Sequence, residues 1–86
     1  NMINNQERTS IIKTLGKQYS ATISLHLKKK KIKNAIGEDY TRQSIRTFVN
    51  GMRENEQVEL AIMQLVNKTV KAKKALQLKR QRLFKV

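Results

Sequence analysis

The sequence predicts an all-α protein of four to five short helices, the last of which continues as an extended basic helix. Two observations lead to this fold class. The 86 residues contain no proline and only three glycines, Gly16, Gly37 and Gly51, so few positions stop a helix. Apolar residues between these glycines recur at intervals of three and four, which places them on one helix face. A chain this short forms one domain. It buries only about 60% of the surface that its unfolded form exposes, so its core is small.

The first segment predicts a helix from about Gln6 to Leu15. Ile11, Ile12 and Leu15 have the spacing of one apolar face. Gly16 follows directly, and glycine readily adopts the left-handed conformation that ends a helix.

The second segment predicts a helix from about Ala21 to Lys31, with Ser20 as its N-cap. Ile23 and Leu27 supply its apolar face, and lysines fill its last turn, where positive charge interacts favourably with the helix dipole. The polar stretch "IKNAIGEDYT" that follows predicts a turn or a short hairpin, from which Tyr40 packs back onto the core.

The third predicted helix is short and runs from about Arg42 to Asn50. Thr41 offers an N-cap oxygen at its start. Ile45, Phe48 and Val49 form its apolar stripe, and a glycine follows its end.

The fourth predicted helix begins at about Glu56, after Asn55 as a cap, and continues into the late 70s. Its buried face holds Val58, Ala61, Ile62, Leu65 and Val66. Beyond Asn67 the apolar stripe is thin. We therefore expect a helical domain over residues 3–66 and a basic helical extension over residues 67–86.

The formal net charge of +13 is concentrated in two blocks. The first block comprises Lys28, Lys29, Lys30, Lys31 and Lys33. The second contains no acid and comprises Lys68, Lys71, Lys73, Lys74, Lys79, Arg80, Arg82 and Lys85. Such an excess indicates a polyanionic partner, because each neutralised phosphate releases condensed counterions, and nucleic acid is the leading candidate.

The predicted helices meet the requirements of a helix-turn-helix domain, in which a short second helix lies in the major groove of DNA. With its apolar stripe facing inward, the helix of residues 42–50 presents hydrogen-bonding side chains and no acid outward. These candidate base contacts are Arg42, Gln43, Ser44, Arg46, Thr47 and Asn50. Gln and Asn pair with adenine, Arg pairs with guanine, and the methyl group of Thr packs against that of thymine.

Two overlapping stretches resemble known helix-turn-helix families. "SIRTFVNGMRENEQVELAIMQLV" is similar to the lambda-repressor-like and Cro-like regulators, and "LHLKKKKIKNAIGEDYTRQSIRTFV" resembles the helix-turn-helix that follows the catalytic domain of large serine recombinases. The link between the second and third helices is longer than in the Cro-like proteins, and Lys31 stands where their turn has a glycine.

The resemblance implies that Gln43, Arg46 and Thr47 are the first base readers, followed by Arg42 and Asn50. The residues expected to contact phosphate are Lys28, Lys29, Lys30, Lys31, Lys33, Thr41 and Arg53. These contacts position the protein on the duplex, whereas base contacts give it specificity.

We expect a binding module and not an enzyme, with no cofactor, no metal and no small-molecule substrate. A lone His26 beside a lysine run is typical of a surface residue, and Glu54, Glu56 and Glu59 are explained by the dipole of the helix that they start. No cysteine is present, and no apolar run is long enough to cross a bilayer. These features favour a cytoplasmic, nucleoid-associated protein.

The sequence thus predicts a sequence-specific double-stranded DNA-binding protein, a small repressor-like transcriptional regulator. A weak homodimer is expected through the C-terminal helix, where Leu76 and Leu83 continue a seam interrupted by Thr69 and Lys79. Two alternatives stay open: an accessory DNA- or RNA-binding protein of a mobile element, and a basic helical protein that binds membrane surfaces.

Overall fold

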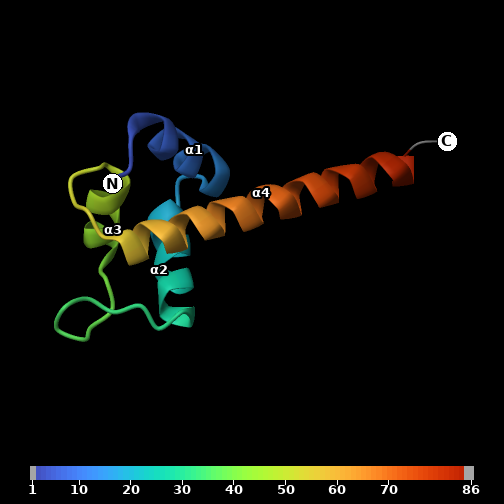
Figure 1. Cartoon of the computed structure of the whole chain (residues 1–86). Coiled ribbons are helices and arrows are strands. Elements are labelled where there is room, and N and C mark those ends of the chain that lie inside the picture. The colour runs from blue at the N-terminus through green and yellow to red at the C-terminus, as the bar shows by residue number, and fades with distance from the viewer. Residues whose placement is uncertain (1, 85–86) are drawn as a thin grey trace.

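The computed structural model describes residues 2–84 and contains four α-helices in this range: α1 (Asn5–Leu15), α2 (Tyr19–Lys29), α3 (Arg42–Val49) and α4 (Glu56–Phe84). The range contains no strand, which confirms the all-α class and gives four helices where four to five were expected. Helices α1, α2 and α3 surround the N-terminal half of α4 (Figure 1). Helix α1 packs on α2 and α4, and α2 also packs on α3 and α4.

Helix α1 has the predicted bounds to within one residue. Asn4 is its N-cap and forms a capping box with Glu7, in which each side chain accepts a hydrogen bond from the other residue's backbone N–H at 2.8 and 3.0 Å. The helix ends at Gly16, as the sequence predicts, but with a φ of 81° and a ψ of −167° this glycine is extended and not in the left-handed helical conformation.

Helix α2 begins two residues earlier than predicted, and Ser20 is not its N-cap. Gln18 holds the cap position without a side-chain hydrogen bond, while Ser20 lies in the first turn and is buried. The partly buried ring of Tyr19 packs against the core. The earlier start brings both residues into the helix, so burial outweighs the capping preference of serine.

Helix α2 also ends two residues earlier than predicted, at Lys29. The N–H of Lys31 donates to Lys28 O at 3.1 Å and the N–H of Ile32 donates to Leu27 O at 3.0 Å, which is the Schellman pattern. Lys31 has a φ of 57° and takes the left-handed position where glycine is usual. The buried side chains of Leu27 and Ile32 belong to the same core cluster and stabilise this end of the helix.

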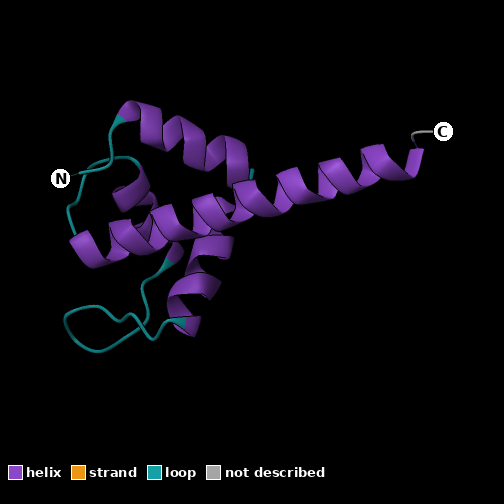
Figure 2. Cartoon of the chain, turned by 45° about the vertical axis from the view of Figure 1, so that its right-hand side comes forward, coloured by secondary structure: helices purple, strands orange, loops and turns teal. Residues whose placement is uncertain are grey.

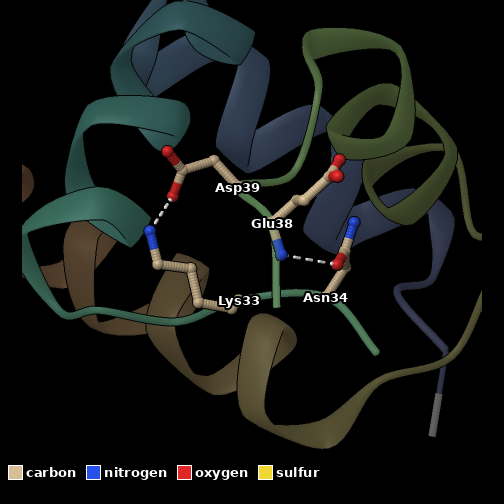
Figure 3. Close-up of polar contacts among 4 residues, drawn as sticks. All are labelled: Lys33, Asn34, Glu38 and Asp39. Carbon is tan, nitrogen blue, oxygen red and sulfur yellow. Dashed lines mark hydrogen bonds and ion pairs between the residues drawn. The ribbon is translucent and has the colours of Figure 1, made fainter. Parts of the chain in front are cut away.

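The segment between α2 and α3 is a turn built around Asn34. Its Oδ1 accepts hydrogen bonds from the backbone N–H groups of Ile36 and Glu38, at 3.1 and 2.9 Å. Lys33 and Asp39, which flank the turn, form an ion pair at 2.5 Å (Figure 3). Tyr40 then returns to the core, as predicted, and its ring meets that of Phe48 edge to face with centroids 5.5 Å apart.

Helix α4 differs sharply between its two halves. Its first half carries the predicted buried face, of which Leu65 is only partly buried, and begins with Asn55 Oδ1 accepting from the N–H of Val58. Val70 is the last residue packed against the core. Every side chain from Lys71 to Phe84 is exposed, and the helix projects freely in both views (Figures 1 and 2). It reaches Phe84, beyond the expected late 70s, because no glycine or proline stops it.

Candidate nucleic-acid interface

Helix α3 separates its apolar and polar side chains completely. Ile45, Phe48 and Val49 are at most 1% exposed, which confirms the predicted inward set. Thr41 is the N-cap, as predicted, and its Oγ1 accepts a hydrogen bond from the N–H of Ser44 at 3.1 Å. The apolar side thus fixes the helix on α2 and leaves its other side free.

Arg42, Gln43 and Arg46 are the members of the predicted base-contact set that are exposed and have no partner. The positions at i, i+1 and i+4 share one side of α3. Within residues 2–84 the structure records no hydrogen bond or ion pair to these three side chains. Their donors and acceptors are therefore available to a partner that lies along α3.

The other three predicted base contacts are engaged within the protein. Ser44 Oγ accepts from Thr41 Oγ1 at 3.1 Å, and Thr47 Oγ1 donates to the backbone carbonyl of Ser44 at 2.5 Å. Asn50 is the C-cap of α3 and accepts a hydrogen bond on Oδ1 from Arg8 Nε at 2.8 Å. Ser44 and Thr47 are half-buried, and their hydroxyl groups form hydrogen bonds within α3 and its N-cap.

The first lysine block is exposed at the end of α2 and in the turn after it. Lys28, Lys29, Lys30 and Lys31 have no ion pair among the described residues. Lys33 differs because its Nζ pairs with Asp39, and the hydrogen bond from Lys33 lowers the pKa of the Asp39 carboxyl. Its charge is thus partly neutralised within the turn.

Arg53, another predicted phosphate contact, packs against the base of α3. Its guanidinium carbon lies 4.8 Å from the centroid of the Phe48 ring, a cation–π geometry. Tyr40 meets the same ring edge to face and accepts a hydrogen bond from Asn55 Nδ2 at 3.2 Å. Arg53 therefore has a structural partner in addition to any ligand.

His26 is not the simple surface residue that the sequence suggests. It is half-buried in a groove between α2 and α4, and its buried Nε2 has no hydrogen-bond partner among residues 2–84. Burial lowers the pKa of the imidazole, and the charges of Lys30, Lys68 and Lys29 lower it further. The imidazole is therefore neutral at pH 7.

Three of the six acids lie together in one groove on the body. A shallow groove between α1 and the start of α4 is lined by Glu7, Glu56 and Glu59 together with Leu60 and Met63. Glu59 also accepts a hydrogen bond from the backbone N–H of Asn55 at 2.8 Å. Among the described residues, no group of three or more His, Asp or Glu side chains is arranged to hold a metal ion.

Sequence analysis missed Arg8 as a neighbour of α3. Arg8 and Asn50 lie 42 positions apart, and no local pattern connects two such residues. The same holds for Gly51, which packs against the backbone of Ile3. The start of α1 therefore lies beside the end of α3.

Comparison of the chain with protein-family models, with curated proteins and with solved structures found no match. The resemblance to helix-turn-helix families stays a prediction, and the function rests on the chemistry of the residues. None of the helices in residues 2–84 has the length and apolar character needed to span a membrane.

Proposed function

We propose that the protein binds double-stranded DNA sequence-specifically, as a small repressor-like regulator in which α3 enters the major groove. One observation carries this proposal: α3 buries its apolar residues entirely and leaves Arg42, Gln43 and Arg46 exposed, without a hydrogen-bond or ion-pair partner among residues 2–84. These groups match the donor and acceptor pattern of guanine and adenine edges. A solvated helix without a ligand more often mixes both signs of charge.

The dimensions of α3 suit this role. An α-helix with its side chains is about 10 to 12 Å across, which fits the major groove of about 12 Å, and the eight residues of α3 extend about 12 Å along it. Helices α2 and α3 pack on each other, as the two helices of a helix-turn-helix must. The turn between them is longer than in Cro-like proteins, and Lys31 adopts the left-handed conformation that a glycine would have.

The lysines at the end of α2 contribute affinity without sequence preference. Lys28 to Lys31 are exposed near the turn that leads into α3, where they can meet the phosphates flanking the groove. The guanidinium of Arg53 adds a further phosphate contact, whereas the hydroxyl of Thr41 already donates to Ser44 Oγ and contributes less than the sequence predicts. Lys33 contributes least, because it already pairs with Asp39.

The exposed half of α4 serves as a charged arm and a weak dimer contact. Leu76 and Leu83 are 59% and 72% exposed, which supports a contact with a second copy of the chain. Cations without acids repel across such a pair, and bound DNA relieves this repulsion. Association with DNA would place the protein at the nucleoid.

Selection of binding sites from random duplex DNA tests the proposal. A defined site, palindromic if the protein binds as a dimer, is the expected result. Replacing Gln43 by Ala is then expected to weaken binding to the selected site by about 1 to 3 kcal/mol and to leave random duplex binding almost unchanged. Gln64→Ala removes an equally exposed amide from α4 and is the matched control.

Competition with single-stranded RNA and flotation with vesicles separate the alternatives. Preferential binding of single-stranded RNA would favour an RNA-binding accessory protein. Flotation with anionic vesicles would favour a membrane-surface role for the exposed Leu76, Leu78, Leu83 and Phe84. Enrichment of no duplex sequence would contradict sequence-specific reading by α3.

A further inference from the structure

Two contacts hold the start of α1 against the end of α3. A Cβ atom on Gly51 would lie 2.5 Å from the carbonyl oxygen of Ile3, so the two backbones are in close contact there. One turn into α1, Arg8 Nε donates to Asn50 Oδ1 at 2.8 Å. The first contact fixes the position of the backbone, and the second fixes a guanidinium group beside α3.

The guanidinium of Arg8 is exposed and free of acid partners. Glu7 is its chain neighbour, but the Glu7 carboxylate accepts from the backbone N–H of Asn4 in the capping box. Between residues 2 and 84 no ion pair to Arg8 is formed. Arg8 therefore keeps its charge available for an anionic partner.

We infer that Arg8, held by Asn50, forms a phosphate-binding site at the junction of α1 and α3. The inference rests on the proposed function and extends its interface to a helix that the sequence did not connect with DNA. Arginine has five N–H donors, of which Asn50 uses the one on Nε. The two terminal nitrogens keep the fork of donors that binds two phosphate oxygens at once.

The site continues a row of side chains along α3. Arg42, Arg46 and Asn50 follow one another at intervals of four, so they lie along one helix face. Arg8 extends this row beyond the C-terminal end of α3. The chain enters α3 from the turn that follows the lysine-rich end of α2 (Figure 1) and leaves it at Gly51, beside Ile3, so the exposed lysines and Arg8 are near opposite ends of the helix.

Asn50 acts as a positioning residue in this arrangement. Its amide oxygen is turned to Arg8, and a bidentate contact with adenine needs that oxygen together with the amide nitrogen. The hydrogen bond restricts the long Arg8 side chain before DNA arrives. Less conformational entropy is then lost on binding.

Four variants of the full chain test the site: Arg8→Gln, Arg8→Lys, Asn50→Ala and the double variant Arg8→Gln with Asn50→Ala. Lys13→Gln removes another exposed cation from the same helix and is the control. The measurements are the affinity for duplex DNA over a range of salt concentrations and the thermal unfolding of each variant.

Arg8→Gln is expected to weaken duplex binding about tenfold and to reduce the salt slope by about 0.9, the value of one phosphate contact. Arg8→Lys retains the charge and is expected to keep the slope of the wild type. Asn50→Ala is expected to weaken binding in the wild-type chain and to have no further effect once Arg8 is Gln, because its role depends on Arg8. Lys13→Gln and the wild type are expected to agree.

An unchanged salt slope in Arg8→Gln, or equal effects of Arg8→Gln and Lys13→Gln, would overturn the site and leave the proposed function intact. Additive effects of Arg8→Gln and Asn50→Ala would overturn the positioning role of Asn50. Failure of the wild type to bind duplex DNA would instead contradict the proposed function itself.

Discussion

The two halves of α4 belong to one helix but are stabilised differently. From Glu56 to Val70 the helix packs its apolar face against α1 and α2. From Lys71 to Phe84 every side chain is exposed. Lys73 Nζ, which donates to Thr14 O at 2.6 Å, makes the last hydrogen bond between this half and the body in the described part of the chain.

Packing of the first half starts the helix, and the helix propensity of the second half extends it. The exposed half is rich in Lys, Ala, Leu, Gln and Arg, all strong helix formers, and it extends a helix that packing has already nucleated. An isolated helix of this length is only marginally stable in water. Packing therefore determines the shape of the body, whereas charge determines what the exposed half can bind.

The largest expected effect is on the stability of the body. Phe48→Ala removes a side chain that is 1% exposed and contacts Tyr40 and Arg53, so a loss of about 3 to 5 kcal/mol in unfolding free energy is expected. Leu83→Ala in the exposed half is expected to change it by less than about 0.5 kcal/mol. Urea unfolding measures both. A similar loss for the two variants would mean that the exposed half is packed.

A smaller loss is expected where the N-terminal segment meets α3. Gly51→Ala places a Cβ against Ile3 at a φ of 73°, and a loss of at least about 2 kcal/mol is expected from the clash and the left-handed backbone together. Gly37→Ala is the control, because its φ is 81° and no atom lies within 4 Å of the added Cβ. Equal losses for the two variants would remove the evidence for the close contact.

At the end of α2 a substitution is expected to stabilise the protein. Lys31→Gly relieves the left-handed conformation of a residue with a side chain, and a gain of about 1 kcal/mol in unfolding free energy is expected. Removal of the same charge by Lys30→Gly, at a right-handed position, is expected to give no gain. Thermal unfolding of the two variants at equal salt distinguishes backbone strain from charge repulsion.

The smallest expected effect is a pH dependence of the body. Burial and the neighbouring Lys30, Lys68 and Lys29 lower the pKa of His26 in the folded protein. The unfolded chain therefore takes up the proton more readily, and stability is expected to fall as pH decreases through about 6.5, the ordinary imidazole pKa. His26→Gln should flatten the stability profile between pH 7 and 5. An unchanged profile would mean that another group titrates there.

The sequence predicts the helices well where apolar spacing and caps agree. The bounds of α1 and α3 are correct to within one residue, and the buried set Ile45, Phe48 and Val49 is correct. The sequence prediction fails at Ser20. Serine is a good N-cap, but it is also small enough to be buried in the first turn of α2. The sequence predicts an end of α4 in the late 70s, before the observed end at Phe84. A thin apolar stripe does not end a helix that is built of strong helix formers.

The candidate interface is less predictable than the fold. The sequence identifies which side of α3 is free, because the apolar residues define the other side. It does not reveal that Lys33 pairs with Asp39, that Arg53 stacks on Phe48 or that Asn50 holds Arg8. Each of these pairings depends on how the turns and the N-terminal segment fold back onto α3.

The structure also indicates where the chain can be truncated to separate the two halves of α4. Removal of all residues after Asn67 would take away Val70, which packs on the core, and the contact of Lys73 with Thr14. A chain that ends at Lys73 keeps both and is the better truncation. It loses the cations Lys74, Lys79, Arg80, Arg82 and Lys85.

The central claim is that α3 reads the sequence of a half-site, while the exposed half of α4 adds charge and a weak dimer contact. The ratio of affinities for a duplex with a single half-site and for a scrambled duplex tests it, measured at one salt concentration for the wild type, Arg46→Ala and the chain ending at Lys73. Arg46→Ala is expected to lower this ratio by about 5- to 150-fold, the equivalent of 1 to 3 kcal/mol. The truncated chain is expected to bind both duplexes more weakly and to keep the ratio of the wild type. An unchanged ratio for Arg46→Ala, or an equal fall for the truncated chain, would contradict the claim.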